Sequence, residues 1–566
     1  MTTATKPSAA ELLKDSSRRL RGTIGPELAA GGTHVSNAAN SLLKFHGSYE
    51  QYDRDTATDL KQRGLEKQYG FMVRVRMPGG RLTAAQYLAL DALAGSHGDA
   101  TLRLTTRQAI QFHGIVKGNL KPAIAAINAT LLTTQAACGD VVRNVTTSPA
   151  PRRDAPHARL QADAELLSTG LLPRSRAYHE IFLDEAPGAA AGEEAEPLYG
   201  ATYLPRKFKI GLALPQDNTI DALSNDLALI AIWQGGGLRG YNVAIGGGMG
   251  MTHNRPDTYP RLASLIGSVG ADDLRAVAEA VVRVQRDHGG RVDRKQARLK
   301  YLVDQKGLPW MRAAIGEALG RPLADPLPMP ALQVPDLLGW HAQGDGTWWL
   351  GVPVPAGRIA DVGRVRLRTA LREAVRRYGI DPVLTPQQDL LLSNIAARYR
   401  GAVTRLLRAH GVTLAGQLTP LARWTLACVA LPTCGQALTE AERVRAPLVA
   451  DIEAVLRRHG LARERISLRI TGCPNGCARS YGGDIGLVGR VPGAYAVFVG
   501  GDFEGTRLSY KLLERVPQER VAAVLEPLLA AFAQGRLRGE GFGDFCHRLG
   551  LAAALLLVEG VQASAA

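Results

Sequence analysis

Two stretches of the chain share one pattern of hydrophobic and polar positions. Residues 71–77 alternate and end at a Pro-Gly-Gly turn, which predicts a strand, and residues 83–95 have the period of a short amphipathic helix. Residues 101–115 predict a second strand region. The same order returns between residues 348 and 388, offset by 277 residues at the turn glycine and by 280 at the second strand. The chain is therefore predicted to hold two copies of a strand–helix–strand unit, with a larger domain after each.

Two further stretches are predicted to be loops or linkers. Residues 186–197 are small and acidic, and residues 321–335 contain five prolines, which favour an extended connector. The proline-rich stretch lies just before the second copy begins. It is the best candidate for a domain boundary.

The composition is that of a globular protein. Of 566 residues, 46% are hydrophobic and 21% are charged, which excludes long-range disorder and a fibrous repeat. The longest apolar run, 549–558, is shorter than the ~18 residues of a membrane span, so no membrane contact is expected. The first 20 residues contain no hydrophobic signal segment, and we expect a cytoplasmic protein.

The chain is basic, with 68 Lys and Arg against 52 Asp and Glu, a formal net charge of +16. Such a balance fits a nucleic acid, an acidic protein partner or a polyanionic ligand. Aromatic residues make up only 5%, and no run of five like charges occurs. The cations form small scattered clusters, which favours a site lined with cations and argues against a nucleic-acid partner.

Four of the six cysteines form two close pairs, Cys428-x5-Cys434 and Cys473-x3-Cys477. A structural zinc site favours C-x2-C, whereas a four-iron cluster accepts wider, uneven spacings. The second pair encloses Asn475 in a Pro-Asn-Gly turn, which can aim thiolates and backbone N–H groups at one point. A zinc site and four unrelated buried cysteines stay open as alternatives. The other two are expected to pack as small hydrophobes: Cys138 and Cys546.

Several cations are spaced as an anion site would require. In a strand, Lys207 and Lys209 share one face and Phe208 lies opposite. Two like charges on one face repel each other unless an anion lies between them, although a solvated strand face is the simpler interpretation. Arg74 and Arg143 are either exposed arginines or parts of the same cage.

A glycine-rich segment and two histidines complete the candidates. The strand at 243–245 runs into Gly246-Gly247-Gly248-Met249-Gly250, whose N–H groups could bind an anion, although a plain turn is the commoner case. His46 and His113 could be read as haem ligands, but histidines satisfied by hydrogen bonds are far more frequent.

These motifs together resemble the sirohaem-dependent sulfite/nitrite reductase family, and within it the assimilatory haemoprotein subunits. The resemblance runs from about residue 21 to about residue 545. It is carried by these segments: RGTI at 21, KFHGSY at 44, MVRVRMPGG at 72, LRLTTRQAIQFHG at 102, YLPRKFK at 203, GGG at 246, ACVALPTC at 427, TGCPNGC at 471 and GEGFGDF at 539. The residues after Cys434 and Cys477 depart from the family pattern, which bears on the potential of a cluster and not on its presence.

The resemblance implies an α+β fold, a pseudo-twofold three-domain sirohaem sulfite/nitrite reductase fold built from an internal repeat. The expected divisions are an N-terminal arm at 1–70, a first ferredoxin-like repeat domain at 71–135, a sirohaem- and substrate-binding domain at 136–335, a second ferredoxin-like repeat domain at 336–415, and a 4Fe-4S cluster and sirohaem-binding domain at 416–566.

The resemblance also implies cofactors and site residues. The two cysteine pairs would hold a 4Fe-4S cluster, and the thiolate of Cys477 would also be the axial ligand of sirohaem iron. The substrate anion would bind to Arg74, Arg143, Lys207 and Lys209. Residues around the macrocycle would be Arg103, Arg107, Gln111, His113, Asn144, Gly246, Gly247, Gly248 and Asn475.

The implied activity is the six-electron reduction of sulfite to sulfide in sulfur assimilation and cysteine biosynthesis. The alternative within the family is a nitrite or dual nitrite/sulfite reductase, and Lys209 favours sulfite because nitrite reductases tend to carry Asn there. No flavin or NADPH motif is evident, so a separate protein must donate the electrons: a flavoprotein alpha subunit, a ferredoxin or a flavodoxin. Such donors tend to be acidic, which suits a basic chain. A basic nucleic-acid-binding protein with a four-cysteine metal site would not explain the repeat, the glycine loop and the lysine pair together.

Overall fold

The first repeat forms a five-stranded sheet in this computed structural model, which describes residues 6–183 and 196–563. Most of the acidic loop predicted at 186–197 lies outside these residues. The order of the sheet is β1-β2-β4-β3-β12. Its strands are β1 (Ser48–Tyr52), β2 (Tyr69–Arg74), β3 (Leu102–Leu104), β4 (Ile110–Ile115) and β12 (Arg358–Ile359). Two helices pack with it, α5 (Ala84–His97) and α6 (Lys117–Ala129). The strand, helix and strand region predicted from the sequence are confirmed here.

The second repeat forms a four-stranded sheet of order β10-β11-β16-β15. Its strands are β10 (Gly339–Ala342), β11 (Thr347–Val352), β15 (Asp381–Leu384) and β16 (Leu390–Ala396), with a small hairpin of β13 (Asp361–Val362) and β14 (Val365–Arg366). Its helices are α11 (Leu367–Tyr378) and α12 (Arg400–Ala409). The helix predicted at 365–377 is therefore confirmed as α11.

The two repeats exchange strands with each other. Arg358 of the second repeat pairs with Arg103 of the first. In return, Arg81 of the first repeat bridges Val383 of the second. Because the exchange is reciprocal, the two repeats form one structural unit related by a pseudo-twofold axis, as predicted.

Equivalent glutamines stabilise the two crossings. Gln108 donates to the carbonyl oxygen of Gly79 and has φ 50°. Gln388, which lies 280 residues further on, donates to the carbonyl oxygen of Ala356 and has φ 68°. The repeats thus share side-chain contacts as well as a chain trace.

One further sheet follows each repeat along the chain, and the two sheets share one topology. In each, three parallel strands are followed by two antiparallel ones. The middle sheet consists of β5 (Thr146–Thr147), β6 (Ile210–Ala213), β7 (Leu227–Gln234), β8 (Gly237–Ile245) and β9 (Ser264–Val269). The C-terminal sheet consists of β17 (Thr425–Ala427), β18 (Leu468–Thr471), β19 (Ile485–Val491), β20 (Ala494–Val499) and β21 (Tyr510–Pro517).

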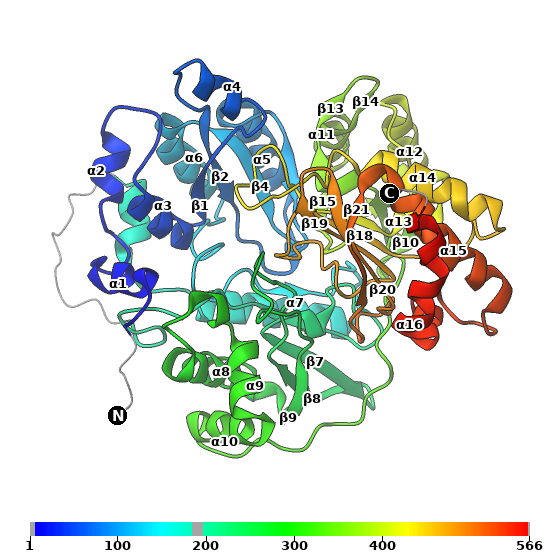
Figure 1. Cartoon of the computed structure of the whole chain (residues 1–566). Helices are drawn as coiled ribbons and strands as arrows, with labels where there is room; N and C mark the ends of the chain where they lie inside the picture. Colours follow the sequence, from blue (N-terminus) through cyan, green and yellow to red (C-terminus); the bar gives the residue numbers. More distant parts are fainter. Residues whose placement is uncertain (1–5, 184–195, 564–566) are drawn as a thin grey trace.

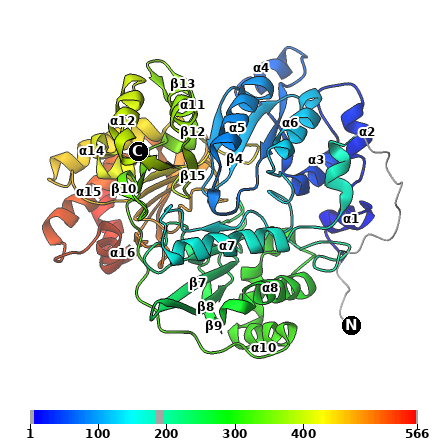
Figure 2. The same cartoon turned by 180° about the vertical axis from the view of Figure 1, so that it is seen from behind.

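Helices cover these sheets. The middle domain carries α7 (Ala155–Gly170), α8 (Leu274–His288), α9 (Leu299–Lys306) and α10 (Leu308–Leu319). The C-terminal domain carries α13 (Pro420–Arg423), α14 (Arg445–Arg458), α15 (Val521–Gly535) and α16 (Phe542–Ala563). Figure 1 shows the repeats above the middle domain, with the C-terminal domain to one side. Seen from behind, α7 runs beneath both repeats (Figure 2).

The apolar core joins the repeats and the middle domain, while the C-terminal domain has a core of its own.

At the N-terminal end of the chain, four short helices flank the first repeat: α1 (Ala9–Ser16), α2 (Ile24–Ala29), α3 (Asn37–Leu43) and α4 (Ala57–Gln62). The proline-rich stretch at 321–335 contains no helix and no strand, as predicted. Over the described residues, every helix is too short or too polar to cross a membrane.

Candidate active site

Both cysteine pairs follow strands of the C-terminal sheet. Cys428 comes directly after β17, and Cys473 comes two residues after β18. These strands are parallel, so their carboxyl ends meet at one edge. The two segments are also bonded to each other, because Gly472 donates its backbone N–H to the Cys428 sulfur at 3.3 Å. The fold therefore brings together cysteines that are 45 residues apart in the sequence.

The thiols of this group influence one another. The pKa of Cys428 lies well above its ordinary value because the thiol is buried and the Cys477 sulfur is close. The same two causes raise the pKa of Cys434, and they raise that of Cys473 to about 12. In the described part of the chain, no three His, Cys, Asp or Glu side chains are grouped tightly enough to hold a metal ion. The thiols are nevertheless close enough to raise one another's pKa, so several thiolates here would repel one another unless a cationic group lay among them.

The turn between Cys473 and Cys477 packs against the glycine loop, residues 246–250. Met251 donates its N–H to the carbonyl oxygen of Pro474 at 2.8 Å. Gly476 has φ +61°, and a Cβ there would lie 2.8 Å from the Tyr481 ring and 3.1 Å from the Met249 oxygen. A side chain at this position would separate the two loops, which explains the glycine.

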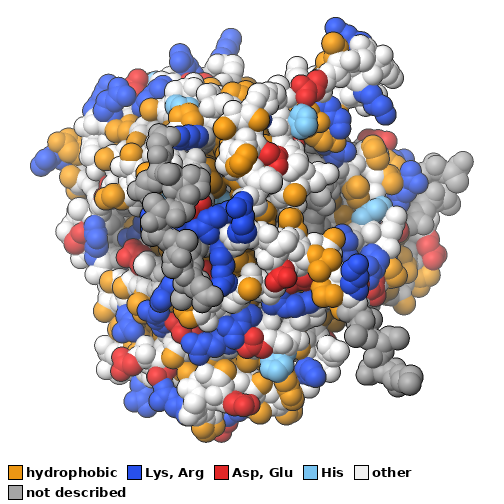
Figure 3. Space-filling model, turned by 90° about the vertical axis from the view of Figure 1, so that its left-hand side faces the viewer, with side chains coloured by type: hydrophobic (Ala, Val, Ile, Leu, Met, Phe, Trp, Pro, Cys, Tyr) orange, Lys and Arg blue, Asp and Glu red, His pale blue; other side chains and the backbone are white. Residues whose placement is uncertain are grey.

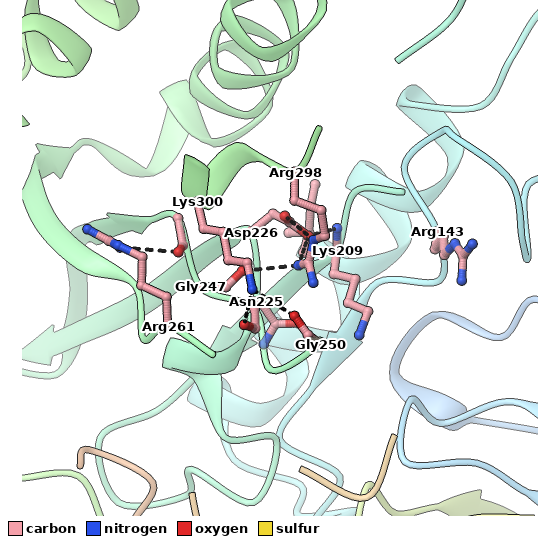
Figure 4. Close-up of polar contacts among 12 residues, drawn as sticks. Arg143, Lys209, Asn225, Asp226, Gly247, Gly250, Arg261, Arg298 and Lys300 are labelled. Atoms are coloured by element: carbon pink, nitrogen blue, oxygen red, sulfur yellow. Dashed lines mark hydrogen bonds and ion pairs between the residues drawn. The ribbon is translucent and has the colours of Figure 1, made fainter. Parts of the chain in front are cut away.

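Two buried cations hold the glycine loop from behind (Figure 4). Arg298 makes a two-point ion pair with the fully buried Asp226, at 3.1 and 2.7 Å, and donates to the carbonyl oxygen of Gly247 at 3.1 Å. Lys300 donates to the carbonyl oxygens of Gly248 at 3.1 Å and Gly250 at 2.8 Å. Gly246 and Gly248 also donate their N–H groups, to the carbonyl oxygens of Asp226 at 2.9 Å and Arg261 at 2.7 Å. The loop is therefore fixed through its carbonyl groups and through two of its N–H groups.

The lysine pair lies on the extended segment that leads into β6. Phe208 is buried and pairs in parallel with Val142, while Lys207 and Lys209 are half-buried on the other side, as the alternation predicted. The Lys209 backbone N–H bonds to Asp226 at 2.9 Å. The ammonium groups of both lysines make no hydrogen bond or ion pair with any residue that the structure describes.

Burial, followed by repulsion from nearby cations, lowers the pKa of both lysines well below the ordinary value. For Lys209 these cations are Arg298 and Arg107, and the Cys477 sulfur acts in the opposite direction. Figure 4 shows the Lys209 ammonium turned away from the Arg298–Asp226 pair. Lys209 therefore lies near Cys477, and neither lysine ammonium has an ion-pair partner among the described residues.

Arg74 and Arg143 are close neighbours of this group. Arg74 is half-buried at the end of β2, and its guanidinium donates to the Cys138 sulfur at 2.9 Å. Arg143 donates through Nε to the carbonyl oxygen of Gly139 at 3.1 Å. Cys138 is buried, as predicted, but no sequence pattern indicates its contact with a candidate anion-binding residue.

The remaining predicted residues are held in different ways. Asn144 uses its whole side-chain amide on the backbone of residues 77, 107 and 108. Arg103 pairs with Glu442 and donates to the carbonyl oxygen of Ala427, beside Cys428. Arg107 donates to Asn225 Oδ1 at 2.7 Å and to the carbonyl oxygen of Asn144 at 2.6 Å. These three stabilise the walls of the site through contacts within the protein.

Two other predicted residues, His113 and Gln111, are buried on β4. The side chain of His113 is buried, its Nε2 has no hydrogen-bond partner among the described residues, and its Nδ1 lies 3.4 Å from the Thr433 hydroxyl. Burial and the nearby Arg358 lower the pKa of His113 to about 3, so this ring is neutral. Gln111 is almost fully buried on β4, opposite both Arg74 and Arg103. His46, by contrast, bonds to the carbonyl oxygen of Leu20 at 3.1 Å and is a satisfied core histidine, as expected.

Several residues that build the site were not predicted. Asp226, Arg298 and Lys300 organise the glycine loop, and the Thr106 hydroxyl donates to the carbonyl oxygen of Cys477 at 2.9 Å. A signal for two of them exists, since Arg298-x-Lys300 repeats the spacing of Lys207-x-Lys209. Asp226 carries no local signal, because its partners are distant in the sequence.

Comparison with known proteins agrees with this geometry. The family model for the nitrite and sulphite reductase 4Fe-4S domain matches residues 162–323, and the ferredoxin-like half domain of nitrite/sulfite reductases matches 63–130 and 341–410. Relatives named sulfite reductase (NADPH) hemoprotein beta-component are 45% identical in Myxococcus xanthus and 46% identical in Xylella fastidiosa strain 9a5c, each over 96% of both chains. The chain belongs to the nitrite and sulfite reductase family. A member of this family is an oxidoreductase.

A solved structure of the same family supports the fold. The NirA protein of Mycobacterium tuberculosis superposes with a TM-score of 0.78 and 25% sequence identity, covering 97% of this chain and 98% of that one. The two half-domain matches fall on the two repeats that exchange strands. The four cysteines of this reductase lie outside the match at 162–323, on the segments that follow two strands of the C-terminal sheet.

Proposed function

We propose that this reductase converts sulfite to sulfide at a site that holds sirohaem and a 4Fe-4S cluster. One observation carries the proposal: the Cys473–Cys477 turn, the glycine loop and the two unpaired lysines converge on one place. The names of the relatives support the same substrate.

The residues present fit both groups. Four cysteines supply the thiolates of a cluster. Burial, followed by the nearby Cys477 sulfur, raises the pKa values of Cys428, Cys434 and Cys473, as expected of thiols that await a cationic partner. Sirohaem carries eight carboxylates, and a buried carboxylate needs cations or N–H donors around it. Arg107 and His113 each have a buried nitrogen without a partner in the described structure. When bound, the two groups would pass electrons from a donor protein to the substrate one at a time.

The chain's own residues bind the anion and manage its protons. Lys207, Lys209, Arg74 and Arg143 place cations where the sulfite oxygens would lie, and positive charge there stabilises electron density on oxygen as the S–O bonds break. Three oxygens leave as water, so protons must arrive repeatedly. The lowered pKa of Lys209 makes it a ready proton donor, directly or through water.

We further propose that a separate acidic protein delivers the electrons. The relatives are named beta-components of NADPH enzymes, which makes a flavoprotein alpha subunit the first candidate donor. Lys and Arg side chains gather on the face shown in Figure 3, and the net charge of +16 would attract an acidic partner. Such a protein would work in the cytoplasm.

The test is to measure cofactor content and turnover together. The purified protein should show a Soret band and a red chlorin-like band, with iron and acid-labile sulfide present. Cys477→Ser should abolish sulfite reduction and lower the content of both cofactors in the purified protein, because serine is a harder and poorer ligand for iron. Cys546→Ser, a buried cysteine in another part of the same domain, is the control and should keep both. A colourless wild-type protein would refute the proposal.

A further inference from the structure

A second cavity lies away from the candidate active site. Its volume is about 500 Å³, and its lining residues come from the first repeat, α7 and β15. None of the residues assigned above to anion, cluster or macrocycle lines it. Its polar lining includes Arg81, Arg153 and Glu165, and its apolar lining includes Leu82 and Leu172.

Arg81 is the unusual residue of this cavity. Its backbone takes part in the strand exchange by bridging Val383. Its guanidinium is half-buried, yet it makes no hydrogen bond or ion pair within residues 6–183 and 196–563. Burial, and then the positive charge of Arg153, lowers its pKa, while the charge of Glu165, which makes no ion pair with it, acts in the opposite direction. A partly desolvated cation next to another cation is costly unless an anion joins them.

The other repeat shows what such an arginine requires. Arg358 occupies the equivalent position, bridging Arg103 as Arg81 bridges Val383. Its guanidinium grips Glu442 at two points, 2.7 and 3.0 Å, and bonds to the Thr101 hydroxyl at 2.9 Å. In that half of the molecule the chain itself supplies a carboxylate to the arginine.

The first half does not supply one. Glu442 lies three residues before α14, and the residue three before the corresponding helix α7 is Arg152. The position equivalent to Thr101 holds a carboxylate, Asp381. Both of its oxygens already accept hydrogen bonds, from the Ala84 N–H and from the Asn394 side chain. The pseudo-twofold relation thus leaves Arg81 without its carboxylate, with open volume in front of it.

We propose that this cavity binds a small carboxylate of the α-amino-acid class. The ligand carboxylate takes the place that Glu442 has in the other half and bonds to Arg81. Glu165, whose carboxylate accepts a hydrogen bond from Gln161 at 2.7 Å, supplies a negative charge for the ligand ammonium. Leu82 and Leu172 offer an apolar wall for its side chain. The site is independent of the proposed reduction and of its cofactors.

The experiment begins with the holoprotein, which is screened by thermal shift against the twenty standard L-amino acids and against inorganic phosphate. The best amino acid is then titrated by calorimetry, together with its analogue that lacks the amino group and its analogue that lacks the carboxylate. We expect the amino acid to bind, the acid to bind more weakly, and the amine not to bind.

Variants locate the site. Arg81→Gln should weaken binding by about ten- to a hundredfold, the effect of removing one charge-assisted hydrogen bond. Arg81→Lys should have an intermediate effect. Glu165→Gln should lower the affinity for the amino acid to that of its deaminated analogue. Arg63→Gln, an exposed arginine paired with Asp59, is the matched control and should bind as wild type. Sulfite turnover with a small dye should be unchanged in all four.

Three outcomes would overturn the proposal. They are no binding by any amino acid, binding of phosphate alone, and an amino-acid affinity unaffected by Arg81→Gln in a variant whose melting temperature matches wild type. A wild-type protein that binds the amino acid but does not reduce sulfite would instead count against the proposed function.

Discussion

Replacing Lys209 by Asn tests how the protein recognises a doubly charged substrate. The change removes one cation and keeps a polar side chain. Asp226 already accepts two bonds from Arg298 and one from the Lys209 backbone, so no carboxylate is available to the lysine ammonium. The bound anion would be its counter-charge. The substitution should therefore act on substrate binding and leave the neighbouring ion pair in place.

The size of the effect follows from the removal of one cationic hydrogen-bond donor. A charge-assisted hydrogen bond contributes about 1.5–3 kcal/mol. At about 1.4 kcal/mol per tenfold, Lys209→Asn should lower kcat/KM for sulfite by roughly ten- to a hundredfold. Sulfite is largely a dianion at neutral pH and nitrite is a monoanion. Nitrite gains less from a second cation, so its reduction should fall less or even rise.

The assay is kcat/KM for both anions with a small dye as donor, alongside sirohaem absorbance. Lys295→Asn, which removes an exposed lysine in the same domain, is the control and should leave both values unchanged. An equal fall for sulfite and nitrite would refute the argument from charge. Loss of sirohaem from the variant would show that Lys209 holds the cofactor and not the substrate.

Three further predictions concern stability and electron supply. Asp226→Asn leaves Arg298 buried without a counter-charge, so it should lower the free energy of unfolding by about 3–5 kcal/mol in urea titrations, and a change below ~1 kcal/mol would contradict the role of this pair. Burial lowers the pKa of His46 from 6.5 to about 4. The unfolded chain therefore binds its proton first as pH falls, and stability should drop on the order of 2 kcal/mol between pH 7 and 5, a loss that His46→Gln should reduce. Rising salt should slow turnover with a protein donor more than with a neutral dye, since exposed charges are screened beyond ~8 Å at ~0.15 M. Equal salt sensitivity would show that docking is not electrostatic.

Local patterns in the sequence predicted much of the fold. The strand, helix and turn of each repeat depend on neighbouring residues, and the structure has them where the alternation placed them. The lysine pair was predictable for the same reason, because alternation in an extended segment fixes which side chains share a face. The repeat itself could be read from two short echoes at a constant offset.

Pairings over long distances could not be read in this way. Arg103 is predicted to lie around the macrocycle, and no local pattern indicates that its guanidinium also pairs with Glu442, which lies 339 residues away. Asp226 and Arg298 are 72 residues apart, and nothing near either one indicates the other. Charged residues become distinguishable only when the fold decides which of them meet, so the sequence predicted a cationic site without its internal ion pairs.

The strand exchange between the repeats also sets the order of events during synthesis. The edge strand β3 cannot acquire its partner β12 until about 250 more residues have left the ribosome. At roughly 5–20 residues per second, that is a wait on the order of tens of seconds with an unpaired edge. The nascent first repeat is therefore a natural client for a chaperone, and a chain truncated before β12 should aggregate and not accumulate as a folded half.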